Sequence, residues 1–235
     1  SGTLMNQRTG AKILVNGKPV TASTTFTAEK KEGSVEVVFA FDASALEGTT
    51  TVVYEKLYTE NKEVAAHTDI NDKGQTIYIP KVRTTAIADD TKDHVTEAKK
   101  DVTIVDTVSY EGLEIGREYT VAGKLMDKET GEPILVNGEE VTASETFTAE
   151  TEEGGIDITF TFDSSALAGK KIVAFEDVTY EGISIGTHED LTDEDQTISY
   201  PEIHTTAADQ ASGSKTMTLG SSVTLVDTVT YKGLT

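Results

Sequence analysis

The stretch "LMDKETGEPILVNGEEVTAS", residues 125–144, decides the fold because it occurs twice: residues 4–23 read "LMNQRTGAKILVNGKPVTAS". Each copy carries Asn-Gly between two short apolar segments, which is a strong signal for a tight β-hairpin. Sliding the chain by 121 positions aligns residues 1–114 with 122–235 without a gap, and 50 of the 114 pairs are identical. The chain is therefore built from tandem repeats of one 121-residue unit.

Two prolines mark the boundaries between repeats. Pro80 and Pro201 each follow a short apolar run, and a Thr-Thr-Ala segment begins a few residues later. We therefore expect a first repeat that lacks its opening strands at residues 1–82, a complete repeat at 83–202, and the opening strands of a further repeat at 203–235. In this frame we expect both chain ends to be cut points within a longer array.

The complete repeat carries a strand signal about every 8–12 residues, in segments rich in Val, Ile, Thr, Tyr and Phe. These segments lie at 102–110, 118–126, 143–149, 156–162, 171–178, 183–186 and 196–201. No segment has helical periodicity except the very short "SSALAG" at 164–169. Seven or more short strands in about 120 residues predict an all-β fold of tandem immunoglobulin-like β-sandwich repeats.

The composition excludes several classes of function. The chain has 41 acidic and 20 basic residues and a net charge of −21, so nucleic acid and anionic membranes are not expected as partners. It has no cysteine, which excludes disulfides, thiolate metal sites and cysteine nucleophiles. No apolar run reaches about 18 residues, so no segment is expected to insert into a membrane.

Four polar residues keep a fixed spacing in both repeats while their neighbours change. "HTDINDKGQT" at 67–76 and "HEDLTDEDQT" at 188–197 share a histidine, two aspartates and a glutamine, and a glutamate lies 12 residues before each histidine. Any one of these could be an ordinary loop residue, but together they indicate a site. They are Glu55, His67, Asp72 and Gln75 in the first repeat, and Glu176, His188, Asp193 and Gln196 in the complete one.

A threonine completes this set. In "VRTTA", residues 82–86, the alternation of a strand places Thr84 on the apolar face and the arginine on the opposite face. Thr205 occupies the matching position in the last segment. Thr107 is the alternative, but it shares its strand face with other hydroxyl residues, and we expect it to face solvent.

The combined motifs resemble those of the T-Q ester-bond domains, also called VaFE repeats, of Gram-positive surface adhesins and pilus-like proteins. "VAFED" at 173–177 is close to the motif that names the family, and "HEDLTDEDQT" resembles its glutamine motif. "VRTTAIADD" at 82–90 resembles the threonine strand that opens such a domain. The resemblance covers the whole chain. It implies an internal ester between Thr84 and Gln196.

The resemblance also implies which residues assist the reaction and where the protein acts. The assisting residues are Glu176, His188 and Asp193, with Glu55, His67 and Asp72 in the same positions of the first repeat. The family's role implies a structural module of an extracellular, cell-wall-anchored protein, with its signal and anchor outside this segment. The cross-link is a single self-modification rather than enzyme turnover, and we expect neither metal nor cofactor.

Elementary chemistry agrees with this set of residues. A threonine hydroxyl needs a base, and neutral imidazole is the natural base near pH 7. A primary amide needs its leaving nitrogen to be protonated, and two neighbouring carboxyl groups can hold such a proton because like charges raise one pKa. We expect Glu176 and Asp193 to form this pair. The bond between Thr84 and Gln75, nine residues apart, is excluded because the segment between them reads as an extended strand.

Two other readings compete with a cross-linked structural module. The acidic stretches "DLTDED" and "DDTKD" suggest a ligand- or cation-binding adhesin module, although they lack the ligand spacing of a calcium loop. A hydrolase that uses Thr, His and Asp is the third reading, and repetition of one catalytic site in every module argues against it. The host ligand is not encoded in any motif.

The permuted order of the repeats predicts a partner for each chain besides its own neighbouring repeats. Residues 1–82 hold Gln75 without a preceding threonine strand, and residues 203–235 hold Thr205 without a following glutamine. Residues 203–235 of one chain therefore match the opening strands that residues 1–82 of another chain lack. We expect head-to-tail strand complementation between chains, with Thr205 placed beside Gln75 of the next chain.

Overall fold

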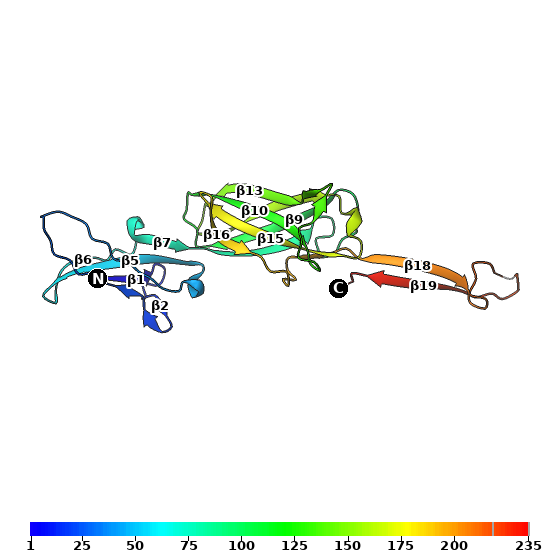
Figure 1. Ribbon diagram of the computed structural model, residues 1–235, viewed down its shortest axis with the longest axis horizontal. Helices are drawn as coiled ribbons and strands as arrows, with labels where there is room; N and C mark the ends of the chain where they lie inside the picture. Colours follow the sequence, from blue (N-terminus) through cyan, green and yellow to red (C-terminus); the bar gives the residue numbers. More distant parts are fainter. Residues whose placement is uncertain (218, 235) are drawn as a thin grey trace. The chain divides into compact units, whose positions relative to one another are not determined.

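A computed structural model of the chain describes residues 1–217 and 219–234 and confirms the all-β prediction (Figure 1). Apart from strands, the described residues contain only three short 3-10 helices. The chain divides into two compact units, which are Ser1–Val82 with Ser109–Glu118 and Thr148–Gly154, and Arg83–Val108 with Tyr119–Phe147 and Gly155–Thr235. The repeat boundaries expected from the prolines remain a prediction.

The complete repeat is a β-sandwich of two sheets (Figure 1). One sheet has the order β13-β10-β15-β16, with β17 also paired to β15, and the other has the order β14-β9-β8. The strands are β8 (Lys81–Ala88), β9 (Val102–Glu111), β10 (Glu118–Asp127), β13 (Thr142–Thr148), β14 (Glu153–Phe162), β15 (Lys171–Tyr180), β16 (Ile183–His188) and β17 (Thr197–Ser199). Each predicted strand segment of this repeat overlaps one of them.

The core of the sandwich follows from alternation along these strands. In β9, Val102, Ile104 and Val108 are buried, while the residues between them are half-buried or exposed, apart from one aspartate. In β14, Ile158 and Phe160 point towards β10 of the other sheet, where their side chains lie against a glycine. The two sheets thus bury one apolar face each.

Local turns form as the sequence predicts. β11 (Leu135–Val136) and β12 (Glu139–Glu140) pair as a hairpin, and Asn137 and Gly138 between them have positive φ values of 54° and 86°. Positive φ at both central residues is the requirement of a type I′ turn, which Asn-Gly meets at low cost. "SSALAG" forms one 3-10 turn, η3 (Ser165–Leu167), and no longer helix.

The first repeat retains one sheet. Its order is β4-β1-β5-β6, with β7 also paired to β5. The elements are β1 (Gly2–Asn6), β2 (Leu14–Val15), β3 (Lys18–Pro19), β4 (Thr21–Ala22), η1 (Ser44–Leu46), β5 (Thr49–Thr59), β6 (Lys62–His67), η2 (Lys73–Gln75) and β7 (Thr76–Ile79). This sheet is the counterpart of the β10-β15 sheet of the complete repeat.

The facing sheet of the first repeat is not formed. Residues 32–41 match β14 in sequence and alternate in the same way, but they form no strand. In the complete repeat β14 pairs with β9, and residues 1–82 contain no segment that matches β8 or β9. The alternating pattern therefore forms no strand without a pairing partner, and Val35 and Phe41, which match inward residues of β14, are exposed.

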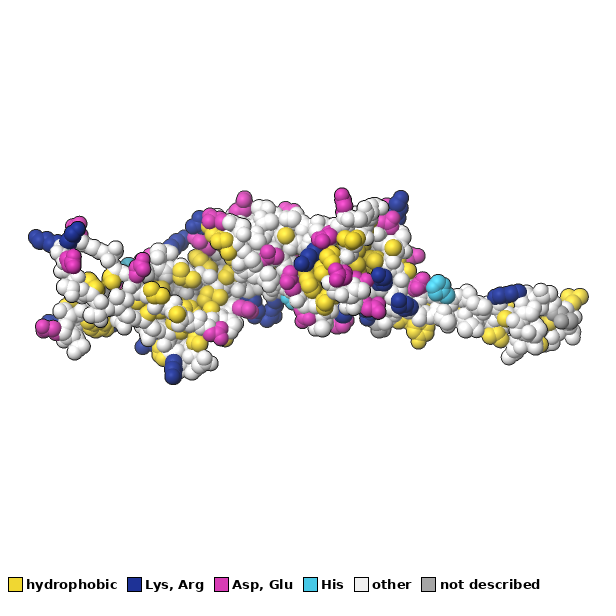
Figure 2. All heavy atoms as spheres, viewed as in Figure 1, with side chains coloured by type: hydrophobic (Ala, Val, Ile, Leu, Met, Phe, Trp, Pro, Cys, Tyr) yellow, Lys and Arg dark blue, Asp and Glu magenta, His cyan; other side chains and the backbone are white. Residues whose placement is uncertain are grey.

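The last segment, residues 203–235, contains strands of the sheet that the first repeat lacks. β18 (Glu202–Asp209) and β19 (Leu225–Lys232) match β8 and β9, and they pair only with each other. With no facing sheet, Ile203, Leu225 and Val229 are exposed. Acidic side chains are spread over the visible surface of the chain, as the net charge of −21 requires (Figure 2).

Candidate functional site

The structure brings all the predicted site residues of the complete repeat together in one compact unit, and adds an aspartate that the sequence analysis did not select. The strands β8, β9 and β15, the end of β16 and the loop before β17 each contribute a side chain. The residues are Thr84, Asp106, Glu176, His188, Asp193 and Gln196.

The inward position of Thr84 is as expected. Thr84 is 6% exposed, whereas Arg83 and Thr85 on the opposite face of β8 are exposed. The alternative threonine, Thr107, is exposed on β9, where its hydroxyl donates a hydrogen bond to Asp157 Oδ1 at 2.7 Å. Thr107 therefore faces away from the interior of the sandwich, and only Thr84 points into it.

Gln196 is fully buried and bound to the aspartate of β9. Its Nε2 donates a hydrogen bond to Asp106 Oδ1 at 3.2 Å, across 90 residues of sequence. The chain at this point is held by backbone bonds, since the Ala86 amide donates to the Asp195 carbonyl and the Ala174 amide donates to that of Gln196. β8 and β15 thus fix the position of the glutamine from both sides.

Glu176 and Asp106 form the acid pair of the site. Burial raises the pKa of Glu176 to about 10, and the nearby Asp106 carboxyl contributes to this rise. Burial also raises the pKa of Asp106, while the nearby Glu176 carboxyl, the Gln196 amide and the Thr85 backbone oppose that rise. The pair therefore holds one proton at neutral pH, mainly on Glu176.

The acid pair differs from the one expected from the sequence. The expected partner of Glu176 was Asp193, which instead lies against the histidine, with 2.7 Å between His188 Nε2 and Asp193 Oδ2. A carboxylate can only accept a hydrogen bond, so His188 Nε2 donates it. Asp193 orients the imidazole, and only its more distant charge contributes to the pKa of Glu176.

His188 is positioned by strand register. It lies directly opposite Glu176 in the β15–β16 pair, and side chains at directly opposed positions share one face of a sheet. The Asp193 loop is held by its own hydrogen bonds, because the Asp195 amide donates to Asp193 Oδ1 at 2.8 Å. The side chains of His188 and Asp193 remain about one-quarter exposed, so this end of the site reaches solvent.

Unpaired polar atoms are concentrated at this site. Among the described residues, five of the eight buried side-chain nitrogen and oxygen atoms without a hydrogen bond of ordinary geometry belong to it. They are Thr84 Oγ1, Asp106 Oδ2, both carboxyl oxygens of Glu176, and Gln196 Oε1. Thr84 is nevertheless near enough to Glu176 to lower the pKa of that carboxyl. Buried polar atoms without partners are costly, and such a cluster indicates reactive groups.

The first repeat has the same Glu, His and Asp arrangement as the complete repeat. Glu55 lies opposite His67 in the β5–β6 pair, and His67 Nε2 is 2.5 Å from Asp72 Oδ2. Asp72 also accepts a hydrogen bond from the Gly74 amide, as Asp193 does from the matching Asp195 amide. Gln75 is only half-buried, because the sheet that would cover it is missing. The Glu, His, Asp and Gln positions are thus a property of one sheet.

Thr205 lies in β18 and is exposed. It aligns with Thr84, and its strand pairs with β19 as β8 pairs with β9. In the complete repeat the second sheet covers Thr84, but no such sheet covers β18. The pairing of Thr205 with Gln75 that the sequence suggests therefore stays a prediction.

Asp106 had a signal in the sequence. The "VDTV" motif occurs at 105–108 and again at 226–229. Alternation along β9 places Asp106 in the inward series between Ile104 and Val108, where a carboxylate is rare unless it has a function. Attention to the buried face of this strand would have identified it.

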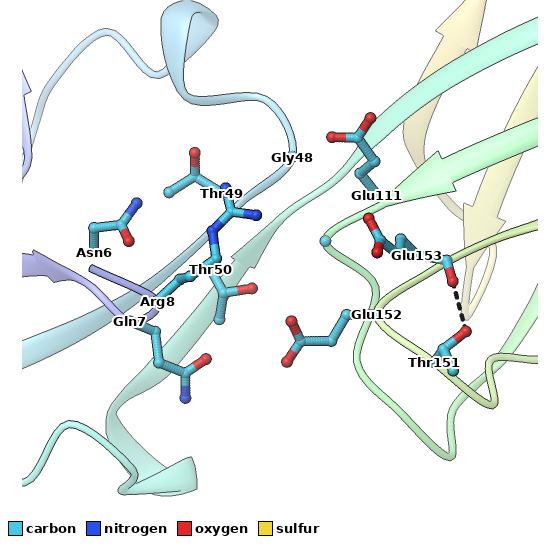
Figure 3. A pocket seen from close by; sticks show the side chains of 11 residues that line it. Asn6, Gln7, Arg8, Gly48, Thr49, Thr50, Glu111, Thr151, Glu152 and Glu153 are labelled. Atoms are coloured by element: carbon cyan, nitrogen blue, oxygen red, sulfur yellow. Dashed lines mark hydrogen bonds between the residues drawn. The ribbon is translucent and has the colours of Figure 1, made fainter. Parts of the chain in front are cut away.

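Other features of the described residues lie apart from this site. Figure 3 shows a polar pocket lined by residues that include Arg8, Glu111 and Glu152, none of which belongs to the predicted set. Among residues 1–217 and 219–234, no three acidic, histidine or cysteine side chains are grouped as metal ligands. Within the same residues, no helix has the length and apolar character needed to cross a membrane.

Comparison with known proteins gives one family match. The model of a family described as "T-Q ester bond containing domain" matches residues 1–79, 80–200 and 201–235. No curated protein matches the chain. Two solved structures of a bacterial adhesin from Mobiluncus mulieris containing intramolecular disulfide, isopeptide and ester bond cross-links are similar. Their TM-scores are 0.42 and 0.41 and their identities 15% and 17%, and each alignment covers 66% of this chain and 74% of the other.

Proposed function

Because the chain belongs to the T-Q ester bond domain family, we propose that the complete repeat forms an internal ester between Thr84 and Gln196. The observation that carries this proposal is the cluster of buried, unpaired polar atoms on Thr84, Asp106, Glu176 and Gln196. These are the nucleophile, the electrophile and the proton carrier of one acyl transfer, and their side chains are buried.

The reaction balances without any other reagent. Thr84 Oγ1 attacks Gln196 Cδ, the threonine O–H bond and the amide C–N bond break, and an ester and ammonia are formed. The hydrogen bond from Gln196 Nε2 to Asp106 orients the amide for this attack. The proton held by the acid pair of Glu176 and Asp106 passes to the leaving nitrogen, which departs as ammonia.

His188 accepts the proton that Thr84 loses. Its position opposite Glu176 and its hydrogen bond to Asp193 support this role, because they orient a neutral imidazole at the edge of the site. The histidine then returns the proton to the acid pair, so these groups end in their starting state. The threonine and glutamine are consumed, so the process is a single self-modification and the protein is not an enzyme.

The ester serves a structural role in this proposal. Thr84 lies near the start of the complete repeat and Gln196 near its end, so the bond closes a loop that contains nearly all of the repeat. A pulling force applied at the two ends then passes through the ester and bypasses the sheets. We propose that tandem repeats of this kind form the stalk of a Gram-positive, extracellular, cell-wall-anchored adhesin, as the resemblance to VaFE repeats suggests.

Intact mass tests the chemistry directly. The folded protein should weigh one ammonia less than its sequence for the complete repeat, and Thr84→Ala or Gln196→Ala should each restore that mass. Thr107→Ala is the matched control, since it removes an exposed hydroxyl and should leave the loss unchanged. A wild-type mass equal to that of the sequence, or a fragment spectrum that joins Gln196 to Thr107, would contradict the proposal.

A further inference from the structure

A glycine lies beside the acid pair in the complete repeat. Gly123 in β10 is directly opposite Glu176 in β15, so a side chain at position 123 would share the inner face of the sheet with that carboxyl. A Cβ atom built there would lie 2.5 Å from Ile158 Cδ1 and 2.7 Å from Phe160 Cζ. Those side chains of the facing sheet fill the space that a residue other than glycine would occupy.

Backbone conformation does not explain why a glycine occupies position 123. Gly123 does not have the positive φ that favours glycine, and it lies within a central strand, where glycine weakens the sheet. Ile158 and Phe160 are each 1% exposed, as is Glu176, so the space is closely packed and closed to water. A glycine in a strand often marks a close approach of other groups, and here the groups are these two side chains.

The first repeat shows the same arrangement independently. Gly2 lies opposite Glu55, and a Cβ atom there would come within 3.0 Å of both Phe39 Cζ and Glu55 Oε1. Phe39 Cζ and Glu55 Oε1 each lie within 3.0 Å of the same built Cβ position, so the two atoms lie close to each other. The tip of the phenylalanine ring therefore lies next to the glutamate carboxyl. The glycine, the phenylalanine and the glutamate all match between repeats.

We propose that Gly123 is a positioning residue for ester formation, which rests on the function proposed above. Because it has no side chain, Phe160 and Ile158 close over the interior next to Glu176 and keep water away from that carboxyl. A dry surrounding keeps the carboxyl protonated at neutral pH, as proton donation to the leaving nitrogen requires. A methyl group at position 123 pushes the two side chains away and admits water beside Glu176.

The test compares the rate of ammonia loss, by intact mass over time, in the 235-residue protein and its Gly123→Ala variant. We expect the variant to cross-link at least about tenfold more slowly. Gly154→Ala is the control for crowding, because its Cβ would lie 2.6 Å from Tyr110 Oη. Tyr110 is four residues along β9 from Asp106, roughly 13 Å away, so this variant should cross-link at the wild-type rate.

A compensating variant tells whether Gly123→Ala slows cross-linking by misplacing the site or by unfolding the protein. Ile158→Val and Phe160→Leu remove both colliding atoms, so the triple variant with Gly123→Ala should fold and recover most of the rate, with the double variant as its reference. The pH profile is the second readout. Water beside Glu176 lowers its pKa, so the alkaline limit of cross-linking in Gly123→Ala should move to lower pH, which a change in stability alone would not produce.

The outcomes distinguish this inference from the proposed function. A wild-type protein that loses no ammonia contradicts the proposed function itself. A wild-type protein that loses ammonia while Gly123→Ala loses it at the same rate overturns the role of Gly123 and leaves the ester in place. A slower Gly123→Ala variant with an unchanged pH profile, or a folded triple variant without recovery, also overturns it.

Discussion

At the scale of single residues, the raised pKa of Glu176 has a consequence for stability. The pKa is about 10 in the folded protein against 4.5 for an ordinary glutamate, so between these values the folded state binds more protons than the unfolded state. Stability therefore falls as pH rises through this window. The uncross-linked Thr84→Ala variant should show a melting temperature that decreases from about pH 5 to pH 10.

The matched variant is Thr84→Ala with Glu176→Gln, in which a neutral amide replaces the protonated acid. Its melting temperature should depend much less on pH over the same window. Equal slopes for the two variants would show that Glu176 titrates normally, and the acid pair with Asp106 would then be wrong.

His188 is the second residue with a separable role. His188→Ala should fold, because the side chain is at the partly exposed edge of the sandwich and no core packing depends on it. Without a base the Thr84 hydroxyl should fail to react, and the variant should keep its full mass. His94→Ala, which removes a histidine outside the site, is the control and should cross-link normally. Full cross-linking of His188→Ala at neutral pH would assign the base to another group.

Where two repeats could be compared, the sequence pointed to residues that the structure places in one unit. Glu176, His188, Asp193 and Gln196 have first-repeat counterparts, so their fixed spacing stood out against changing neighbours. Asp106 has no counterpart in residues 1–82, and the first-repeat comparison could not reveal it. The pairing of acids was also beyond the sequence, because it depends on which of two carboxyl groups the packing of the two facing sheets places beside Glu176.

At the scale of elements, the proposed ester would join β8 to the loop before β17 and should stabilise the fold. A cross-link that closes a loop of more than 100 residues contributes roughly 4–5 kcal/mol by the analogy with disulfides. Thr84→Ala should therefore lower the free energy of unfolding by about this amount, measured in denaturant. Thr85→Ala, an exposed hydroxyl on the same strand, is the control. Equal unfolding of Thr84→Ala and wild type would show that the bond does not stabilise the sandwich.

Elements were predictable where their partners are present. The strand segments of residues 83–202, the Asn-Gly hairpin and the absence of a long helix all follow from alternation and turn chemistry. Residues 32–41 carry the same alternation as β14 and yet form no strand, because a strand requires hydrogen bonds from a neighbour that residues 1–82 do not contain. Sequence pattern specifies which face is buried, and pairing decides whether the strand exists.

At the scale of the whole molecule, residues 1–82 and 203–235 hold complementary parts of one repeat. Residues 32–41 lack the neighbour that β9 provides for β14, and β19 is the counterpart of β9. A polypeptide of residues 1–235 should therefore associate head to tail, with β19 of one copy beside residues 32–41 of the next. The contact joins two different surfaces, so it should produce open chains or rings and not two-fold dimers.

Covalent linkage is the sharpest test of this association. When β18 and β19 complete the first repeat of another copy, Thr205 takes the position of Thr84, and Asp227 takes that of Asp106. The new site then contains Glu55, His67 and Gln75 from the second copy. Thr205 should form an ester with Gln75, and a denaturing gel at rising protein concentration should show a ladder of linked chains.

The controls separate the covalent bond from the contact that precedes it. Thr205→Ala should abolish the ladder while leaving concentration-dependent association in native conditions, because it removes the nucleophile and keeps the strands. Thr206→Ala changes the neighbouring hydroxyl on the opposite face of β18 and should leave the ladder intact. If the wild type runs as a single band at every concentration, covalent assembly is wrong. If it is also monomeric by light scattering, these exposed strands do not recognise each other, and the complementarity of the two segments is limited to their sequence.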